Sequence, residues 1–186
     1  MLLGDQFKDK EQLPKNMAII KINESKINNE RNTVVSSYAN WQPETRFITP
    51  SFPSNSIGML DLNSIAIGVS PAFSMRVEHP TGQEYAEHLQ NLAKYFELPL
   101  LENTDVLQIN KQDDVFHLQT EKYTLKAKYI VWSAGEYQYP STGGFSGSEL
   151  CLHTSTVAKY GELDGDDFLI IGGYESGIDA AYHLAR

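Results

Sequence analysis

The expected fold rests on one stretch near the C-terminus, FLIIGGYESGIDAAYHLAR, residues 168–186. Its apolar start predicts a buried strand, the two glycines a tight turn, and the residues after them a helix. Such a turn lets the backbone approach a pyrophosphate, whose charge is stabilised by the N–H groups at the start of the helix. The stretch therefore predicts the beginning of a dinucleotide-binding unit.

The glycine pattern of this turn supports two interpretations. In the GxGxxG frame, Gly172 is the first glycine and Gly177 the third, but Tyr174 replaces the second, where a pyrophosphate would come closest. Many connections between strands and helices use glycines only for their geometry. Pyrophosphate binding, with Gly173 and Ser176 among the donors, and a purely structural turn both remain open at this point.

Composition excludes several classes of protein. The chain has 186 residues, with 24 acidic against 15 basic side chains and scattered lysines, so nucleic acid is not an expected partner. Cys151 is the single cysteine, which excludes an internal disulfide and a CxxC pair and suits a reducing cytoplasm. No apolar run approaches the roughly 20 residues of a membrane span, the N-terminus does not resemble a signal peptide, and the five histidines lack metal-site spacing. We expect a cytoplasmic protein without a membrane segment or a metal.

The middle of the chain predicts one helix and a sheet. Thr81 and Glu84 form a capping-box pattern, and apolar residues follow at helical spacing: Tyr85, Leu89, Leu92, Ala93 and Phe96. A buried strand is expected at Leu98–Leu101. Three segments alternate apolar and polar residues and predict an antiparallel meander: Val106–Ile109, Val115–Thr120 and Tyr123–Ala127.

Two further segments have the character of ligand-binding elements. Tyr129–Ser133 is apolar almost throughout, as in a parallel strand covered on both faces, and the loop that follows it would border a crevice or form an ordinary turn. Trp41–Pro80 is a long stretch with little periodicity. Within it, Arg46–Asn55 combines a cation, hydroxyls and prolines, which suits a planar ring ligand or a loop stiffened for stability alone.

Several motifs in the same order resemble a known family of flavoenzymes. They are Trp41–Asn55, Gly58–Asn63, Ser70–Phe73, Glu78–Gly82, Tyr129–Pro140 and Phe168–Ala181. The chain from about Thr33 to Arg186 is similar to bacterial FAD-dependent pyridine-nucleotide oxidoreductases related to flavin-containing monooxygenases and to thioredoxin-reductase-like bacillithiol disulfide reductases.

The resemblance implies an α/β fold in which a Rossmann-like FAD domain with an antiparallel meander is interrupted by an NADPH domain. It divides the chain into a partial FAD domain (1–140), a linker (141–166) and the first strand, turn and helix of the NAD(P)-binding domain (167–186). The FAD-side residues that it implies are Trp41, Arg46, Thr49, Pro50, Ser51, Val106, Ser133, Ala134 and Gly135. The residues that it implies for the NADPH pyrophosphate are Gly172, Gly173, Glu175, Ser176 and Gly177.

Two departures from the family pattern accompany the resemblance. The family opens with a strand and a GxGxxG turn for the FAD pyrophosphate, whereas Met1 falls where the following helix would be, so we expect a chain truncated at both ends. The acid that binds the ribose is either Glu30, which fits the spacing to Trp41, or Glu24, which better fits the apolar run before it. We prefer Glu30.

The function implied is hydride transfer from NADPH to FAD and then to oxygen or another small-molecule acceptor. A dithiol relay has no CxxC to use, and no catalytic acid or base is assigned. A second hypothesis is a truncated remnant that binds nucleotide weakly or not at all. A third, a small NAD(P)-binding module without flavin, is disfavoured because the only nucleotide turn is incomplete at its C-terminal side. Association into a homo-oligomer is left open.

Overall fold

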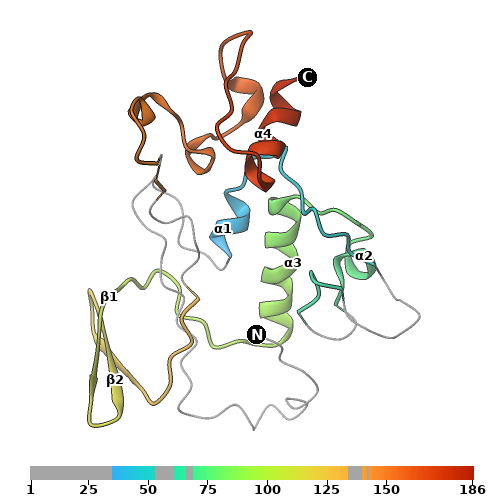
Figure 1. Cartoon of the computed structure of the whole chain (residues 1–186). Coiled ribbons are helices and arrows are strands. Elements are labelled where there is room, and N and C mark those ends of the chain that lie inside the picture. Colours follow the sequence, from blue (N-terminus) through green and yellow to red (C-terminus); the bar gives the residue numbers. More distant parts are fainter. Residues whose placement is uncertain (1–34, 53–60, 66–68, 134–139, 142) are drawn as a thin grey trace.

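The computed structural model describes residues 35–52, 61–65, 69–133, 140–141 and 143–186 (Figure 1). Glu24, Glu30, Ala134 and Gly135 lie outside these residues. The helices are α1 (Ser36–Ala39), α2 (Pro71–Ser74), α3 (Gly82–Tyr95) and α4 (Glu175–Leu184). The strands are β1 (Val106–Gln112), β2 (Val115–Thr120) and β3 (Thr124–Ala127). In the described stretch before α4, the chain forms the short 3-10 turns η3 (Ser148–Leu150), η4 (Thr154–Thr156) and η5 (Tyr160–Glu162).

Helix α3 begins at the predicted capping box. The Thr81 hydroxyl accepts a hydrogen bond from the backbone N–H of Glu84 at 3.2 Å, and the Glu84 carboxylate accepts one from the backbone N–H of Thr81 at 2.8 Å. These bonds satisfy donors that every helix start leaves unpaired. Tyr85 and Ala86 are buried on α3, which stands between α1 and α2 in Figure 1. The predicted helix is therefore confirmed.

The predicted meander is also confirmed. The three strands form an antiparallel sheet in the order β1-β2-β3, with Ile109 opposite Leu118 and Leu118 opposite Leu125. Leu118 and Ala127 are the buried apolar residues of this sheet. Figure 1 shows the sheet well apart from α3, so cross-strand pairs rather than contacts with α3 hold its three strands together.

The three predicted apolar strands are not formed in the described part of the chain. Phe168–Ile171 and Tyr129–Ser133 have no regular secondary structure, and Leu98–Leu101 contains only one bridging residue. Leu169 is 89% exposed and Trp132 is 63% exposed. A parallel strand acquires its hydrogen bonds and its burial from neighbouring strands, and no described strand pairs with these segments. The parallel sheet of the predicted Rossmann-like fold is thus absent from the described residues.

The described helices also bear on the membrane prediction. None of them combines the length and the apolar character that crossing a bilayer would require.

The hairpin between β1 and β2 turns on two aspartates. Asp113 and Asp114 have φ values of 47° and 61°. Two successive positive φ values are typical of a type I′ turn, which matches the twist of the flanking strands and favours Asn-Gly. The ammonium group of Lys111 lies 2.9 Å from the Asp114 carboxylate. Because the Asp114 side chain is almost fully exposed, this ion pair contributes little stability.

We expect the double change Asp113→Asn with Asp114→Gly to stabilise the hairpin by about 0.5 kcal/mol, because both new residues adopt positive φ more easily. Hydrogen exchange of the β1 and β2 amides should slow roughly twofold. The control, Asp113→Ala with Asp114→Ala, should accelerate the same amides. Faster exchange in the Asn-Gly variant would contradict the assigned turn.

Candidate functional site

Trp41 packs against α3 within a cluster of aromatic rings. Its ring centroid lies 5.3 Å from that of Tyr38 and 5.0 Å from that of Phe47, and Phe47 in turn lies 4.5 Å from Tyr85. A Cβ atom on Gly82 would lie 2.7 Å from the Cβ of Trp41 and would overlap the carbonyl oxygen of Tyr38. Glycine at the start of α3 therefore allows this close approach.

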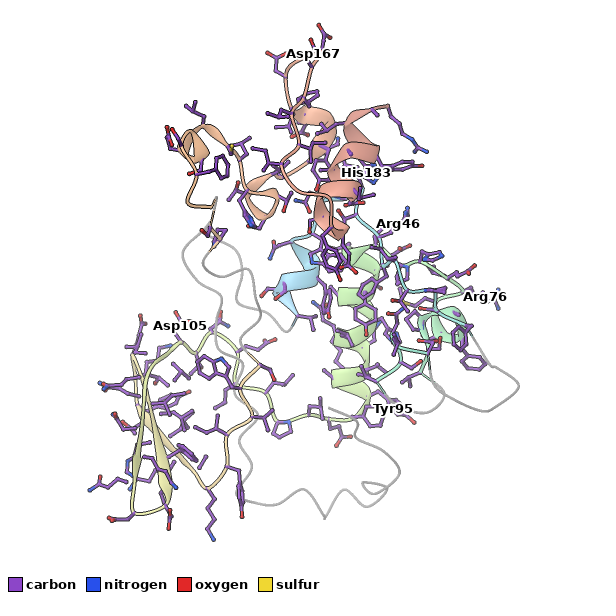
Figure 2. The ribbon with its side chains drawn as sticks, viewed as in Figure 1. Arg46, Arg76, Tyr95, Asp105, Asp167 and His183 are labelled. Carbon is purple, nitrogen blue, oxygen red and sulfur yellow. The ribbon has the colours of Figure 1, made fainter. Side chains whose placement is uncertain are left out.

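Arg46, the second predicted residue of this loop, is bound at the N-terminus of α3 (Figure 2). Its backbone pairs with that of Thr81 in an isolated antiparallel bridge. Its guanidinium lies 3.9 Å from the Glu84 carboxylate and donates to the carbonyl of His79 at 3.3 Å. The hydrogen bonds from Thr81, and then the charge of Arg46, lower the pKa of the Glu84 carboxyl. Arg46 therefore contributes to the position of the loop on α3.

Asp61 is the centre of a buried polar network next to this loop. Its carboxylate accepts hydrogen bonds from the backbone N–H of Phe52 at 3.0 Å, from the N–H of Asn63 at 2.9 Å, and from the Ser70 hydroxyl. Burial alone would raise the pKa of the Asp61 carboxyl, but these hydrogen bonds outweigh it and hold the pKa below its ordinary value of 3.8. Asp61 is therefore a buried, charged acceptor that joins three segments.

Asn63 extends this network to the remaining predicted residues of the loop. Its side-chain amide donates to the carbonyl of Thr49 and to the Ser51 hydroxyl, both at 2.8 Å. Its own carbonyl accepts from the Tyr85 hydroxyl of α3 at 2.8 Å. Burial raises the pKa of Tyr85 to about 12, so this hydroxyl keeps its proton and remains a donor. Thr49 and Ser51 are held on both sides of Pro50, which is exposed.

His88 connects α3 to the segment that supplies Ser70. Its Nε2 donates to the carbonyl of Val69 at 3.0 Å, and its Nδ1 lies 3.1 Å from the Ser74 hydroxyl oxygen. Burial lowers the pKa of His88, partly offset by the Val69 hydrogen bond and the charge of Asp61, so neutral pH leaves it uncharged.

The sequence interpretation missed the residues that organise this network, Asp61, Asn63 and His88. The polar pair Asp61 and Asn63, set among apolar neighbours, was the available signal for the first two, because such residues are usually buried only when they are hydrogen-bonded.

The predicted dinucleotide turn has the geometry of a close backbone bend. Gly172 has a φ of 111°, and a Cβ atom on Gly177 would overlap the Gly172 carbonyl oxygen. Gly172 and Gly173 themselves face open space. The glycine at 177 therefore allows the turn to fold onto α4, which is the role of the third glycine in the GxGxxG frame.

The start of α4 leaves donors uncovered. Tyr174, its N-cap residue, makes no side-chain capping bond and is 83% exposed. Within the described part of the chain, the backbone N–H groups of Glu175, Ser176 and Gly177 donate to no acceptor. Such groups at a helix start favour an anion. The exposed Glu175 carboxylate lies in the same turn and opposes this effect.

The other predicted residues are not brought to either place. Val106 begins β1 opposite Thr120 in the sheet that Figure 1 shows apart from α3, and Ser133 lies exposed in an unpaired segment. The structure thus gathers Trp41, Arg46, Thr49, Pro50 and Ser51 on one loop and Gly172–Gly177 on one turn. The roles of all these residues in binding remain predictions.

Comparisons with known proteins place the chain in context. A family model described as pyridine nucleotide-disulphide oxidoreductase matches residues 17–186. An uncharacterized CzcO-like oxidoreductase of Geobacillus kaustophilus (strain HTA426) is 31% identical over 112 residues, which cover 58% of this chain and 32% of that protein. The uncharacterized oxidoreductase CzcO of Bacillus subtilis (strain 168) is 26% identical over 112 residues, which again cover 58% of this chain and 32% of that protein. The chain thus spans about a third of the curated relatives it matches.

Among solved structures, the chain resembles the bacillithiol disulfide reductase Bdr (YpdA) from Staphylococcus aureus. The TM-score is 0.60 at 22% sequence identity, and the match covers 82% of this chain and 44% of that one. This likeness shows the fold: a mixed helix and strand arrangement of the flavoprotein reductase type, with a small antiparallel sheet.

We expect Asp61→Asn to destabilise the chain by about 3 kcal/mol, because an amide leaves one of the buried donors without its acceptor. The folded-state pKa of Asp61 is lowered, so its contribution is present above pH 3.8 and is lost as the pH falls through the folded value. Urea unfolding at pH 7 and pH 3, followed by tryptophan fluorescence, should show a smaller difference between variant and wild type at pH 3. Exposed Asp167→Asn is the control, and equal stability of the two variants at pH 7 would contradict the network.

Proposed function

Because this chain belongs to the pyridine nucleotide-disulphide oxidoreductase family, we propose that it supplies the FAD- and NADPH-binding segments of an enzyme that transfers a hydride from NADPH to FAD. The electrons then pass to oxygen, as in a monooxygenase, or to another small acceptor. The family implies flavin and nicotinamide nucleotide cofactors, and a bound flavin supplies the ability to accept a hydride and pass its electrons on.

The observation that carries the proposal is the turn at Gly172–Gly177. The backbone can bend there because Gly172 has positive φ and Gly177 has no Cβ, and the N–H groups at the start of α4 face no acceptor among the described residues. A pyrophosphate oxygen would accept hydrogen bonds from those N–H groups. These residues fit the phosphate part of NADPH.

The loop at Trp41–Ser51 is proposed to border the flavin. Its backbone is fixed by the Asp61 and Asn63 hydrogen bonds and by the packing of Trp41 on α3, so a ring placed against it would meet a loop already held in shape. Because Val106 and Ser133 lie elsewhere, the described residues do not assemble a complete flavin pocket. We therefore assign no step of the reaction to these residues.

For the molecule that accepts the electrons from the flavin, we propose only a chemical class. The chain has one cysteine, so a dithiol relay cannot be built within it. The structural relative is named a bacillithiol disulfide reductase, which makes a low-molecular-weight disulfide the alternative acceptor to oxygen. We also propose a cytoplasmic location, with which the acidic composition and the single cysteine agree.

Calorimetric titration with NADP⁺ tests the nucleotide turn. We expect Gly177→Ala to weaken binding at least about tenfold, because its Cβ would push the Gly172 carbonyl out of place and open the turn. Gly144→Ala is the matched control, since a Cβ there meets nothing within 4 Å and its φ is not positive. Equal affinities of the two variants would contradict the assigned turn.

The flavin part has a separate test. The visible absorption spectrum of the purified chain is recorded before and after incubation with excess FAD and desalting. A retained flavin band would support the flavin part, in which the loop at residues 41–51 is held in place for the ring. A colourless protein that also fails to take up FAD would overturn the flavin part and favour the interpretation as a remnant.

A further inference from the structure

The turn at residues 42–45 docks onto the C-terminal segment of the chain. The side-chain amide of Gln42 donates to the carbonyls of Thr154 at 2.5 Å and Val157 at 2.9 Å. The Thr45 hydroxyl donates to the Asp179 carboxylate of α4 at 2.6 Å. These bonds join parts of the chain that are more than 100 residues apart in sequence. The turn follows directly on Trp41, so it belongs to the proposed flavin-side loop.

Asp179 is held from two directions. One of its oxygens accepts the Thr45 hydrogen bond, and the other lies 3.4 Å from Nε2 of His183, one helical turn further along α4. The His183 ring stacks on the buried ring of Tyr160, with centroids 5.9 Å apart and planes 3° from parallel. Figure 2 shows His183 on the part of the molecule that lies above Arg46. The Asp179 carboxylate is therefore held by His183 of its own helix as well as by Thr45.

Glu44 adds a further contact to the same junction. One of its carboxylate oxygens accepts a hydrogen bond from the backbone N–H of Gly161 in η5 at 3.4 Å, while Oε2 is buried and accepts none from the described residues. Burial, with the charges of Asp179 and Glu44, raises the pKa of Tyr160 to about 12. Tyr160 thus remains neutral between two acidic side chains.

Helix α4 connects the two turns: it begins in the turn proposed for NADPH, and its Asp179 contacts the turn at residues 42–45. Asp179 lies two residues after Gly177, so a displacement of the Thr45 contact would move the start of α4 relative to Trp41. A hydrogen bond to a charged group is among the stronger single contacts available for this purpose.

We propose that Asp179 is a positioning residue that fixes the nucleotide turn of α4 to the flavin-side loop through Thr45. The two segments then keep one relative orientation. The purpose of this docking rests on the proposed function, whereas the docking itself does not. It makes Thr45 and Asp179 determinants of how the nicotinamide and the flavin would be aligned.

Hydrogen exchange of the full chain tests the docking without any nucleotide. Thr45→Val removes the hydroxyl with little change in volume and should speed exchange of the α4 amides at residues 179–184 about tenfold or more. Asp179→Ala should do at least the same, because it also removes the contact with His183, and adding Thr45→Val to it should change the exchange little further. Thr45→Ser, which keeps the hydroxyl, should restore slow exchange.

The β2 and β3 amides are the internal reference, because they lie in the separate sheet. Unchanged α4 exchange in Thr45→Val would overturn the proposal, as would an equal rise in the sheet, which would indicate general unfolding.

A spectroscopic readout separates docking from nucleotide binding. The chain has two tryptophans, so Trp132→Phe leaves Trp41 as the only tryptophan, whose emission is recorded with excitation that tyrosine does not absorb. We expect NADP⁺ to change Trp41 emission in this background and not after Thr45→Val, while the calorimetric affinity stays similar. NADP⁺ binding without any Trp41 response in the intact chain would overturn the coupling. If NADP⁺ binds to no variant, the proposed function fails, and the exchange experiment still decides whether Asp179 docks α4.

Discussion

A buried carboxylate needs donors on several sides, and Asp61 obtains them from three segments that must therefore fold together. Its oxygens accept from Phe52, Asn63 and Ser70, and Asn63 passes the constraint on to the loop at residues 49–51 and to Tyr85 of α3. An irregular loop has few backbone partners of its own. Here the side chains of Asp61 and Asn63 supply what a helix or a sheet would supply elsewhere, so the loop has a defined shape.

The elements that could be predicted from the sequence are those whose contacts are local. The capping box joins residues three apart, and the meander pairs neighbouring segments, so their patterns lie within a short window. The apolar runs at Tyr129–Ser133 and Phe168–Ile171 gave an equally clear pattern but are not strands, because a parallel strand depends on neighbours distant in sequence. The Asp61 network was missed for a related reason: its meaning depends on donors that only the folded chain brings near.

The candidate site shows the same division. The spacing of Gly172 and Gly177 predicted a bend, and the structure supplies a steric reason for both glycines. Tyr174 at the second position counted against a close phosphate, yet its side chain is mostly exposed and makes no capping bond to the helix start. The flavin-side residues were predicted as one set, whereas among the described residues of that set the structure gathers those on the loop beside α3. Family membership and the turn therefore carry the functional proposal more firmly than the flavin contacts do.

The contact between Thr45 and Asp179 spans 134 residues, and this separation has a consequence for how the chain folds. The meander and α3 depend on short-range contacts and can form early, whereas closing so long a loop is entropically costly and comes late. At the usual speed of protein synthesis, roughly 10 s or more passes between the emergence of Thr45 and that of Asp179 from the ribosome. During that interval α4 has not been made and the turn at residues 42–45 has no docking partner. Its polar side chains Gln42, Glu44 and Thr45 can be hydrated until α4 is available.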